Sequence, residues 1–153
     1  MSGIRERIAA AEPAGSRPLQ DLLERLAERG LLTAEETGTA HGSAGLVEIH
    51  GITQDSRTVR PGTLFVAVPG LHVDGRAFVD QAVRAGAAAV LVERGVGASI
   101  PQVVVRDARR ALATAAAWWS GDPARHLDIV GITGTDGKTT SSILTTAALE
   151  AAG

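Results

Sequence analysis

Residues 131–140 read Gly-Ile-Thr-Gly-Thr-Asp-Gly-Lys-Thr-Thr. An apolar run, Leu127-Asp128-Ile129-Val130, precedes this stretch, and a sequence typical of a helix, Ser141 to Ala152, follows it. A strand, a glycine-rich turn and a helix that opens with Lys-Thr form the context of a phosphate-binding loop, in which backbone N–H groups and the helix N-terminus face one anion. The stretch therefore predicts a loop that binds the phosphates of a nucleotide.

The residue types in this loop predict individual roles. In such loops a lysine, here Lys138, reaches the β- and γ-phosphates, and a hydroxyl, here that of Thr139, binds Mg²⁺. Lys138 is the single lysine among 15 cationic residues, and arginine's planar fork does not replace a flexible ammonium group. The sequence departs from the general phosphate-loop pattern at Ile132, where that pattern has its first glycine. An ordinary glycine-rich turn between a strand and a helix is the alternative.

The composition excludes several classes of function. The chain has 153 residues, 44% of them hydrophobic, which is enough for a buried core. With 15 basic and 17 acidic residues the net charge is −2, so nothing argues for nucleic acid as a partner. The chain has no cysteine, which rules out disulfides, thiolate metal sites and a cysteine nucleophile. No apolar run resembles a signal peptide or a membrane span, so we expect a cytoplasmic protein with no membrane partner.

The remaining sequence predicts alternating strands and helices. The first helix has an apolar face made of Leu19, Leu22, Leu23 and Leu26, and Gly30 closes it. Strands are expected at 46–52, 64–68, 88–92 and 102–105. Helices are expected at 77–85, with Phe78 buried, and at 108–119, where Asp107 is the cap and one of Trp118 and Trp119 enters the core. This alternation predicts an α/β fold with a largely parallel sheet.

Three ordered motifs lie between the first helix and residue 76. They are Thr53-Gln54-Asp55-Ser56-Arg57, Pro61-Gly62-Thr63-Leu64-Phe65-Val66-Ala67-Val68 and Gly70-Leu71-His72-Val73-Asp74-Gly75-Arg76. The residues of the first motif leave two interpretations open. Asp-Ser-Arg after a strand offers an acceptor, a hydroxyl and a cation to a uracil edge or a diphosphate. Alternatively, Asp55 and Ser56 form a capped turn with nearby backbone N–H groups, and Asp74 caps the following helix in the same way.

Together with the loop at 134–140, these motifs resemble the Mur ligases of peptidoglycan synthesis, and most closely the MurE type, the UDP-N-acetylmuramoyl-tripeptide synthetases. The resemblance covers residues 46–153. It implies an ATP-binding loop made of Gly134, Thr135, Asp136, Gly137, Lys138, Thr139 and Thr140, with Lys138 as the catalytic residue and Thr139 as the Mg²⁺ ligand. It also implies a UDP-substrate site made of Gln54, Ser56, Leu71, His72 and Val73. Asp136 replaces the family's usual Asn, and we expect its carboxylate to approach the metal directly or through water.

The resemblance implies an ATP-dependent ligase with ATP and Mg²⁺ as cofactors. In the family, the D-glutamyl carboxylate of UDP-MurNAc-L-Ala-D-Glu is phosphorylated to an acyl phosphate. The amine of an amino acid, such as diaminopimelate or lysine, then attacks it and gives an amide, ADP and phosphate. The implied partners are therefore a UDP-MurNAc-peptide and an amino acid. The groups that orient the amine, and the family's modified lysine, are expected beyond Gly153.

The chain divides into four expected segments. These are an N-terminal helix and loop at 1–45, a UDP-substrate-binding α/β domain at 46–120, a linker at 121–126, and the first strand, loop and helix of an ATP-binding central domain at 127–153. Because a phosphate loop normally precedes further strands, we expect a fragment of a longer enzyme that lacks ligase activity by itself. Two alternatives remain. One is a MurF-type ligase that adds a dipeptide to UDP-MurNAc-tripeptide, which Arg76 in place of His disfavours. The other is a stand-alone UDP-ligand-binding module without catalysis.

Overall fold

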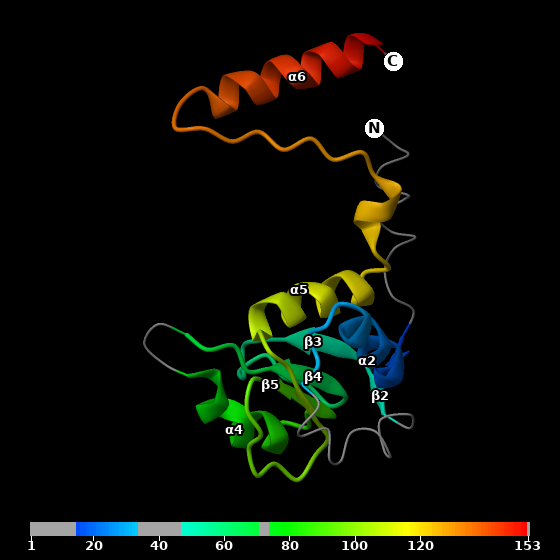
Figure 1. Ribbon diagram of the computed structural model, residues 1–153, viewed down its shortest axis with the longest axis vertical. Coiled ribbons are helices and arrows are strands. Elements are labelled where there is room, and N and C mark those ends of the chain that lie inside the picture. The colour runs from blue at the N-terminus through cyan, green and yellow to red at the C-terminus, as the bar shows by residue number, and fades with distance from the viewer. Residues whose placement is uncertain (1–14, 34–46, 71–73, 153) are drawn as a thin grey trace. The chain divides into compact units, whose positions relative to one another are not determined.

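The computed structural model describes residues 15–33, 47–70 and 74–152. The chain falls into two compact units, Met1–Pro123 and Ala124–Gly153. The first unit contains the sheet and most of the helices, and the second contains the glycine-rich loop and one long helix (Figure 1).

A four-stranded parallel sheet forms the centre of the first unit. Its strands, in the order in which they lie side by side, are β3 (Gly51–Thr53), β4 (Thr63–Val66), β5 (Ala89–Val92) and β6 (Gln102–Val104). Every residue of β4 and β5 is buried, as expected when both faces of a parallel sheet are covered. The predicted α/β fold with a parallel sheet is confirmed.

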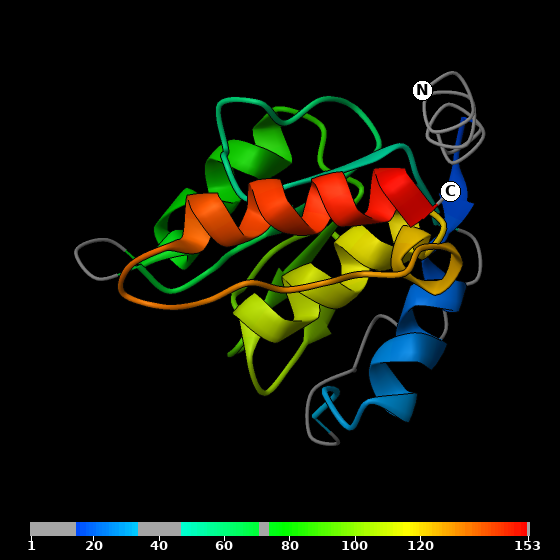
Figure 2. The same cartoon turned by 90° about the horizontal axis from the view of Figure 1, so that it is seen from above.

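One face of the sheet packs against α2 (Leu19–Glu28) and α5 (Ala108–Trp119). Leu64, Leu91 and Val103 point to this face from three successive strands. The four leucines predicted for the first helix are all buried in this layer, because an apolar stripe at helical spacing needs a covering surface. Seen from above, α2 and α5 lie side by side (Figure 2). Arg29 of α2 also donates a hydrogen bond to the Thr114 hydroxyl of α5, at 3.1 Å.

The other face packs against α4 (Val79–Arg84) and against the loops that connect the strands. The expected helix at 77–85 is divided, since a 3₁₀ turn, η2 (Gly75–Phe78), precedes α4. The prediction that Phe78 is buried is wrong, because its side chain is 39% exposed. The tighter winding of the 3₁₀ turn takes Phe78 off the face of α4 that Val79 and Ala82 bury.

The strand expected at 46–52 is also divided. Its first part, β2 (Glu48–Ile49), pairs in antiparallel fashion with β1 (Arg17–Pro18), whereas its second part is β3 of the parallel sheet. The residue between them, His50, donates its backbone N–H to the Gly62 carbonyl at 2.9 Å. The chain therefore changes partner strands within one extended run.

Helix α5 has well-defined ends. The Asp107 carboxylate accepts a hydrogen bond from the Arg110 backbone N–H at 2.9 Å, which confirms the predicted cap. After α5 the backbone turns left-handed at Gly121 (φ 73°) and at Asp122 (φ 53°). The carboxylate of Asp122, a residue only 8% exposed, forms an ion pair with Arg25 of α2. The end of α5 is thus tied to the neighbouring helix.

The second unit contains α6 (Lys138–Ala152), which follows a short 3₁₀ turn, η3 (Pro123–His126), at the boundary. The strand predicted at 127–130 is wrong: the segment has no strand structure, and Ile129 is 70% exposed. A strand needs a neighbour to satisfy its backbone groups, and the described part of this unit provides none. The helix begins at Lys138 rather than at the expected Ser141, whose N–H bonds the Gly137 carbonyl at 2.9 Å.

No helix in the described part of the chain is long and apolar enough to cross a membrane.

The adjacent residues Trp118 and Trp119 offer a matched test of the core. Trp118 is 1% exposed, as predicted for one of the pair, whereas Trp119 is only partly buried against the same cluster. Trp118→Ala should lower the free energy of unfolding by about 3–5 kcal/mol, because a fully buried ring is lost. Trp119→Ala should cost about 1–2 kcal/mol. Urea unfolding followed by far-ultraviolet circular dichroism measures both values, and equal losses would contradict the assigned packing.

Candidate functional site

The carboxyl ends of the parallel strands meet at one edge of the sheet, which is where α/β folds bind their ligands. The loop after β3 contains the predicted UDP-site residues Gln54 and Ser56. The segment after β4 leads to η2, and the segment after β5 begins with Glu93 and Arg94. The other predicted UDP-site residues, Leu71, His72 and Val73, lie outside the described residues.

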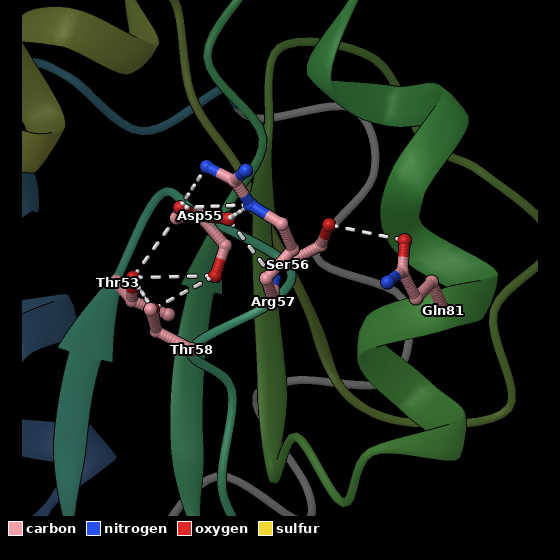
Figure 3. A network of polar contacts seen from close by, with 6 residues as sticks. All are labelled: Thr53, Asp55, Ser56, Arg57, Thr58 and Gln81. Carbon is pink, nitrogen blue, oxygen red and sulfur yellow. Dashed lines mark hydrogen bonds and ion pairs between the residues drawn. The ribbon is translucent and has the colours of Figure 1, made fainter.

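The loop after β3 is a self-contained polar turn (Figure 3). The Asp55 carboxylate accepts hydrogen bonds from the Arg57 backbone N–H at 3.0 Å and from the Arg57 Nε and Nη2 at 2.9 and 2.7 Å. The Thr58 hydroxyl donates to the Asp55 carbonyl at 2.9 Å, and the Asp55 N–H donates to the Thr53 hydroxyl at 3.1 Å. For Asp55, the capped-turn interpretation is therefore the one that the structure shows.

The same contacts set the charge of the turn. Hydrogen bonds from the side chain and backbone of Arg57 lower the pKa of Asp55 from 3.8 to about 2, and the pair raises the pKa of Arg57. Both groups stay ionised at neutral pH. Because their charges cancel, the turn offers a ligand hydrogen-bonding groups but no net charge.

Ser56 lies between the two members of this pair. Its hydroxyl donates to the Gln81 Oε1 of α4 at 3.1 Å (Figure 3). Gln54 is exposed beside it. The sequence analysis missed Gln81, because nothing in a helical pattern indicates which polar residue faces a loop 25 positions earlier.

A hollow of about 250 Å³ lies over the carboxyl ends of β4 and β5. Its lining residues are Ala67, Pro69, Asp74, Arg76, Glu93 and Arg94. The Asp74 carboxylate accepts from the Arg76 backbone N–H and Nε, both at 2.9 Å, and from Nη2 at 2.7 Å. The predicted cap is thus present, although it caps η2. These bonds, with a smaller contribution from Arg94, lower the pKa of Asp74.

The sequence analysis also missed Glu93 and Arg94. The available signal was their position directly after the expected strand at 88–92, since residues that follow a parallel strand line the binding edge.

In the second unit, the side chain of Lys138 bonds back to the loop at 134–140, to which it belongs. Gly134 (φ 155°) and Gly137 (φ 74°) adopt left-handed backbone conformations that favour glycine. The Lys138 Nζ donates to the carbonyls of Gly134 and Thr135 at 2.6 and 3.2 Å. Thr139 and Thr140 lie in the first turn of α6 and are exposed. These residues are consecutive in the chain, and their assignment to ATP stays a prediction.

These residues fit the phosphates of a nucleotide, because a curled backbone, an ammonium group and the N-terminus of a 15-residue helix are combined. They provide fewer ligands for a metal ion. Within the described ranges, no three His, Asp, Glu or Cys side chains form a group that could hold an ion. A Mg²⁺ ion at this loop would depend on Thr139, on nucleotide phosphates and on water.

Residues 48–119 match the model of the Mur ligase family, catalytic domain. This part of the chain is a Mur ligase family domain, and the members of that family are ATP-dependent ligases.

The curated relatives are named as diaminopimelate ligases or tripeptide synthetases. A UDP-N-acetylmuramoyl-L-alanyl-D-glutamate--2,6-diaminopimelate ligase of Listeria monocytogenes is 51% identical over 98 residues, covering 64% of this chain and 20% of that protein. A UDP-N-acetylmuramyl-tripeptide synthetase of Roseiflexus sp. is 51% identical over 109 residues, covering 69% and 21%. The diaminopimelate ligase of Streptomyces coelicolor is 43% identical over 145 residues, covering 92% and 28%. The chain thus spans only 20–28% of the length of these relatives.

Solved structures with a similar fold come from the MurF type. A crystal structure of MurF from Acinetobacter baumannii is 31% identical, with a TM-score of 0.53 over 69% of this chain and 21% of that one. The UDP-N-acetylmuramoylalanyl-D-glutamyl-2,6-diaminopimelate--D-alanyl-D-alanyl ligase of the same organism is 30% identical, with a TM-score of 0.58 over 84% and 26%. The sequence and structure comparisons therefore agree on the family.

The low pKa of Asp55 can be tested by titration. In the full chain, the Asp55 carboxyl resonance should titrate with a midpoint of about 2, and Arg57→Ala should return it towards 3.8. Because the folded-state pKa is depressed, the stabilisation is complete above pH 3.8 and is lost as the pH falls towards 2. Carbon-detected NMR measures the midpoint. Arg60→Ala, which removes the same charge elsewhere, should leave it unchanged, and an equal shift in both variants would contradict the specific pair.

Proposed function

We propose that this chain is the UDP-substrate-binding part and the ATP loop of a MurE-type amide ligase. The reaction adds an amino acid, diaminopimelate or lysine, to UDP-MurNAc-L-Ala-D-Glu. The observation that carries the proposal is the 43–51% identity to relatives named as diaminopimelate ligases and tripeptide synthetases. The Streptomyces match covers 92% of the chain, so it includes both units.

The proposal assigns a task to each segment. Residues 1–45 lead into the first domain, and residues 46–120 bind the UDP substrate. Residues 121–126 are the linker to the ATP-binding part, which begins with residues 127–153. Support comes from the parallel sheet with its polar carboxyl edge, and from the boundary between the units at Pro123. Gln54 and Ser56, with residues 71–73, hold the nucleotide end of the substrate.

The ATP loop contributes binding and charge neutralisation. Lys138, with the backbone N–H groups of residues 134–140, holds the β- and γ-phosphates, and the Thr139 hydroxyl joins the shell of Mg²⁺. The D-glutamyl carboxylate of the substrate attacks the γ-phosphorus of ATP and displaces ADP, which gives an acyl phosphate. The amine of the amino acid then attacks the acyl carbon, loses a proton and displaces phosphate, which gives the amide. Phosphoryl transfer of this kind depends on positioning and electrostatics more than on covalent chemistry by the protein.

A MurF-type ligase is the second candidate, because the solved structures of similar fold are MurF enzymes. Those structures are only 30–31% identical, against 43–51% for the curated relatives named for diaminopimelate ligation or tripeptide synthesis. The two candidates differ in substrate. The first acts on UDP-MurNAc-L-Ala-D-Glu with a free amino acid, and the second acts on the tripeptide with a dipeptide.

A chimera tests the proposed function. We expect this chain, replacing the matching segment of the Streptomyces coelicolor ligase, to support ATP-dependent addition of diaminopimelate to UDP-MurNAc-L-Ala-D-Glu. Lys138→Ala in the chimera should lower the rate by at least about a hundredfold, since transition-state charge stabilisation is lost. Thr139→Ala should also slow the reaction and raise the Mg²⁺ requirement. Product formation by liquid chromatography measures all rates.

The matched control is Thr146→Ala, which removes an exposed hydroxyl from a later turn of the same helix. This variant should ligate at the rate of the unmodified chimera. Near-normal turnover by Lys138→Ala would remove the loop from the chemistry. A well-folded chimera that adds no amino acid to the dipeptide substrate, or prefers the tripeptide, would contradict the MurE assignment.

A further inference from the structure

Helix α5 ends in a hydrogen-bonded motif that explains the left-handed glycine after it. The Gly121 N–H donates to the Trp118 carbonyl at 3.2 Å, and the Asp122 N–H donates to the Ala117 carbonyl at 2.7 Å. This pair of bonds is the Schellman motif, in which the residue after the helix cap is left-handed and is usually glycine. Gly121, with φ 73°, occupies that position. The motif needs one left-handed residue, and Gly121 supplies it.

Asp122 is also left-handed, and the helix cap does not explain this. Its φ is 53°, and no other residue besides glycines has a positive φ in the ranges that the structure describes. Aspartate tolerates this conformation better than most residues, but it persists only where surrounding contacts hold it. Pro123 adds to the strain, because the residue before a proline prefers extended backbone. The local sequence therefore favours a different conformation at residue 122 from the one observed.

An ion pair from α2 holds Asp122 in this conformation. The carboxylate contacts the Arg25 Nη1, and the side chains of Asp122 and Arg25 are 10% and 33% exposed. A carboxylate this buried needs a charged or hydrogen-bonding partner. The two residues are 97 positions apart, so the pair forms only when α2 and α5 are packed together. A long-range contact thus acts on a residue whose conformation the helix cap does not set.

A second arginine lies at the same end of α5. The Arg17 guanidinium lies over the Trp118 ring, 5.8 Å from its centroid, and a Cβ atom at Gly121 would be 3.8 Å from the Arg17 Nη2. The helix dipole favours cations at this end. Burial stops here, since Asp122 is 8% exposed and every residue from 123 to 144 is exposed. Asp122 is therefore the last buried residue among those that the structure describes.

We propose that residue 122 is a hinge with two positions, and that the ion pair between Arg25 and Asp122 selects between them. With the pair closed, Asp122 is left-handed. With the pair open, Asp122 takes the extended conformation that Pro123 favours, and the chain leaves α5 in another direction. Residues at the ends of helices commonly absorb such a change of φ. The hinge lies where the first unit ends, and the proposal does not depend on the proposed function.

The helix cap is the same in both positions of the hinge. A change of φ at residue 122 is a rotation about the bond between its nitrogen and its Cα atom. The Asp122 N–H lies before the part of the chain that this rotation moves, so its bond to the Ala117 carbonyl remains, as does the bond of Gly121. The change is therefore confined to one residue and to the direction of the chain after it.

The test measures the sign of φ at residue 122 in the full chain by NMR, from scalar couplings and Cα chemical shifts. We expect a positive φ in the unmodified chain and a negative φ in Arg25→Ala, because the ion pair is lost while Pro123 remains. The population with positive φ should fall about tenfold or more, which is the factor expected for a hydrogen bond to a charged group. Arg25→Lys keeps the charge and should retain the positive φ.

A second variant and a matched control accompany this measurement. Arg25→Met keeps the apolar stem without the charge, so it should give a negative φ even if Arg25→Ala does not fold. The control is Arg29→Ala, which removes an arginine one turn later on α2 that bonds the Thr114 hydroxyl of α5 at 3.1 Å. This control should leave φ at residue 122 positive. Unfolding midpoints measured by circular dichroism show which variants are folded.

Two results would overturn the hinge. If φ at residue 122 stays positive without the Arg25 guanidinium, in whichever of the alanine and methionine variants is folded, the helix cap alone sets this residue. If Arg29→Ala changes φ as much as the Arg25 variants do, the effect comes from looser packing of α2 on α5 and not from the ion pair.

Discussion

The burial of β4 and β5 on both faces is the constraint on which the rest of the first unit depends. Two apolar layers, one with α2 and α5 and one with α4, are needed to cover strands that expose no residue. Polar groups without partners are then disfavoured on both faces, because their burial is costly, and the buried hydroxyls of Thr63 and Thr114 are both hydrogen-bonded. The remaining place for chemistry is the edge where the strands end. Ser56, Gln81, Arg76 and Arg94 all lie at or beside that edge.

The second unit has no comparable constraint. None of the described residues of α6 is buried, and its apolar side chains Ile143, Leu144 and Leu149 are between 61 and 64% exposed. What organises the glycine-rich loop is local: left-handed glycines, the start of a helix, and a lysine bonded to carbonyls three and four residues earlier. Local sequence therefore specifies the loop even without the flanking strand.

The features predicted correctly from the sequence depend on residues close together in the chain. The leucine stripe of α2 and the Asp107 cap are of this kind, since spacing or a single side chain defines them. The prediction of a strand at 127–130 failed because an apolar run forms a strand only when a neighbouring strand pairs with it. The prediction that Phe78 is buried failed because a change from α-helix to 3₁₀ winding rotates the side chain away from the buried face. The spacing of apolar residues does not indicate such a change.

The residues at the candidate binding edge were predicted only in part, for a related reason. Gln54 and Ser56 belong to a recognisable motif, but the partner of Ser56 comes from α4, and Arg94 comes from the segment after β5. The fold brings Ser56 and Gln81 into contact and places Arg94 after another strand of the same sheet, and no local pattern connects these residues. Glu93 illustrates the same limit, since its role at the start of α5 depends on a contact across 15 positions.

Asp-x-Arg occurs twice at this edge, as Asp55-Ser56-Arg57 and as Asp74-Gly75-Arg76, with nearly the same hydrogen bonds. Each forms a clasp in which the aspartate and the arginine bond to each other around a central residue, and that residue makes a further hydrogen bond outside the motif, from the Ser56 hydroxyl to Gln81 and from the Gly75 N–H to the Val68 carbonyl. The two central positions differ in the space they leave for a side chain. A Cβ atom at Gly75 would lie 2.7 Å from the Val68 carbonyl oxygen, so this clasp accepts no side chain. The central residue of the other clasp already carries one, so position 56 is where a side chain at this edge can be exchanged while the Asp55–Arg57 pair is kept.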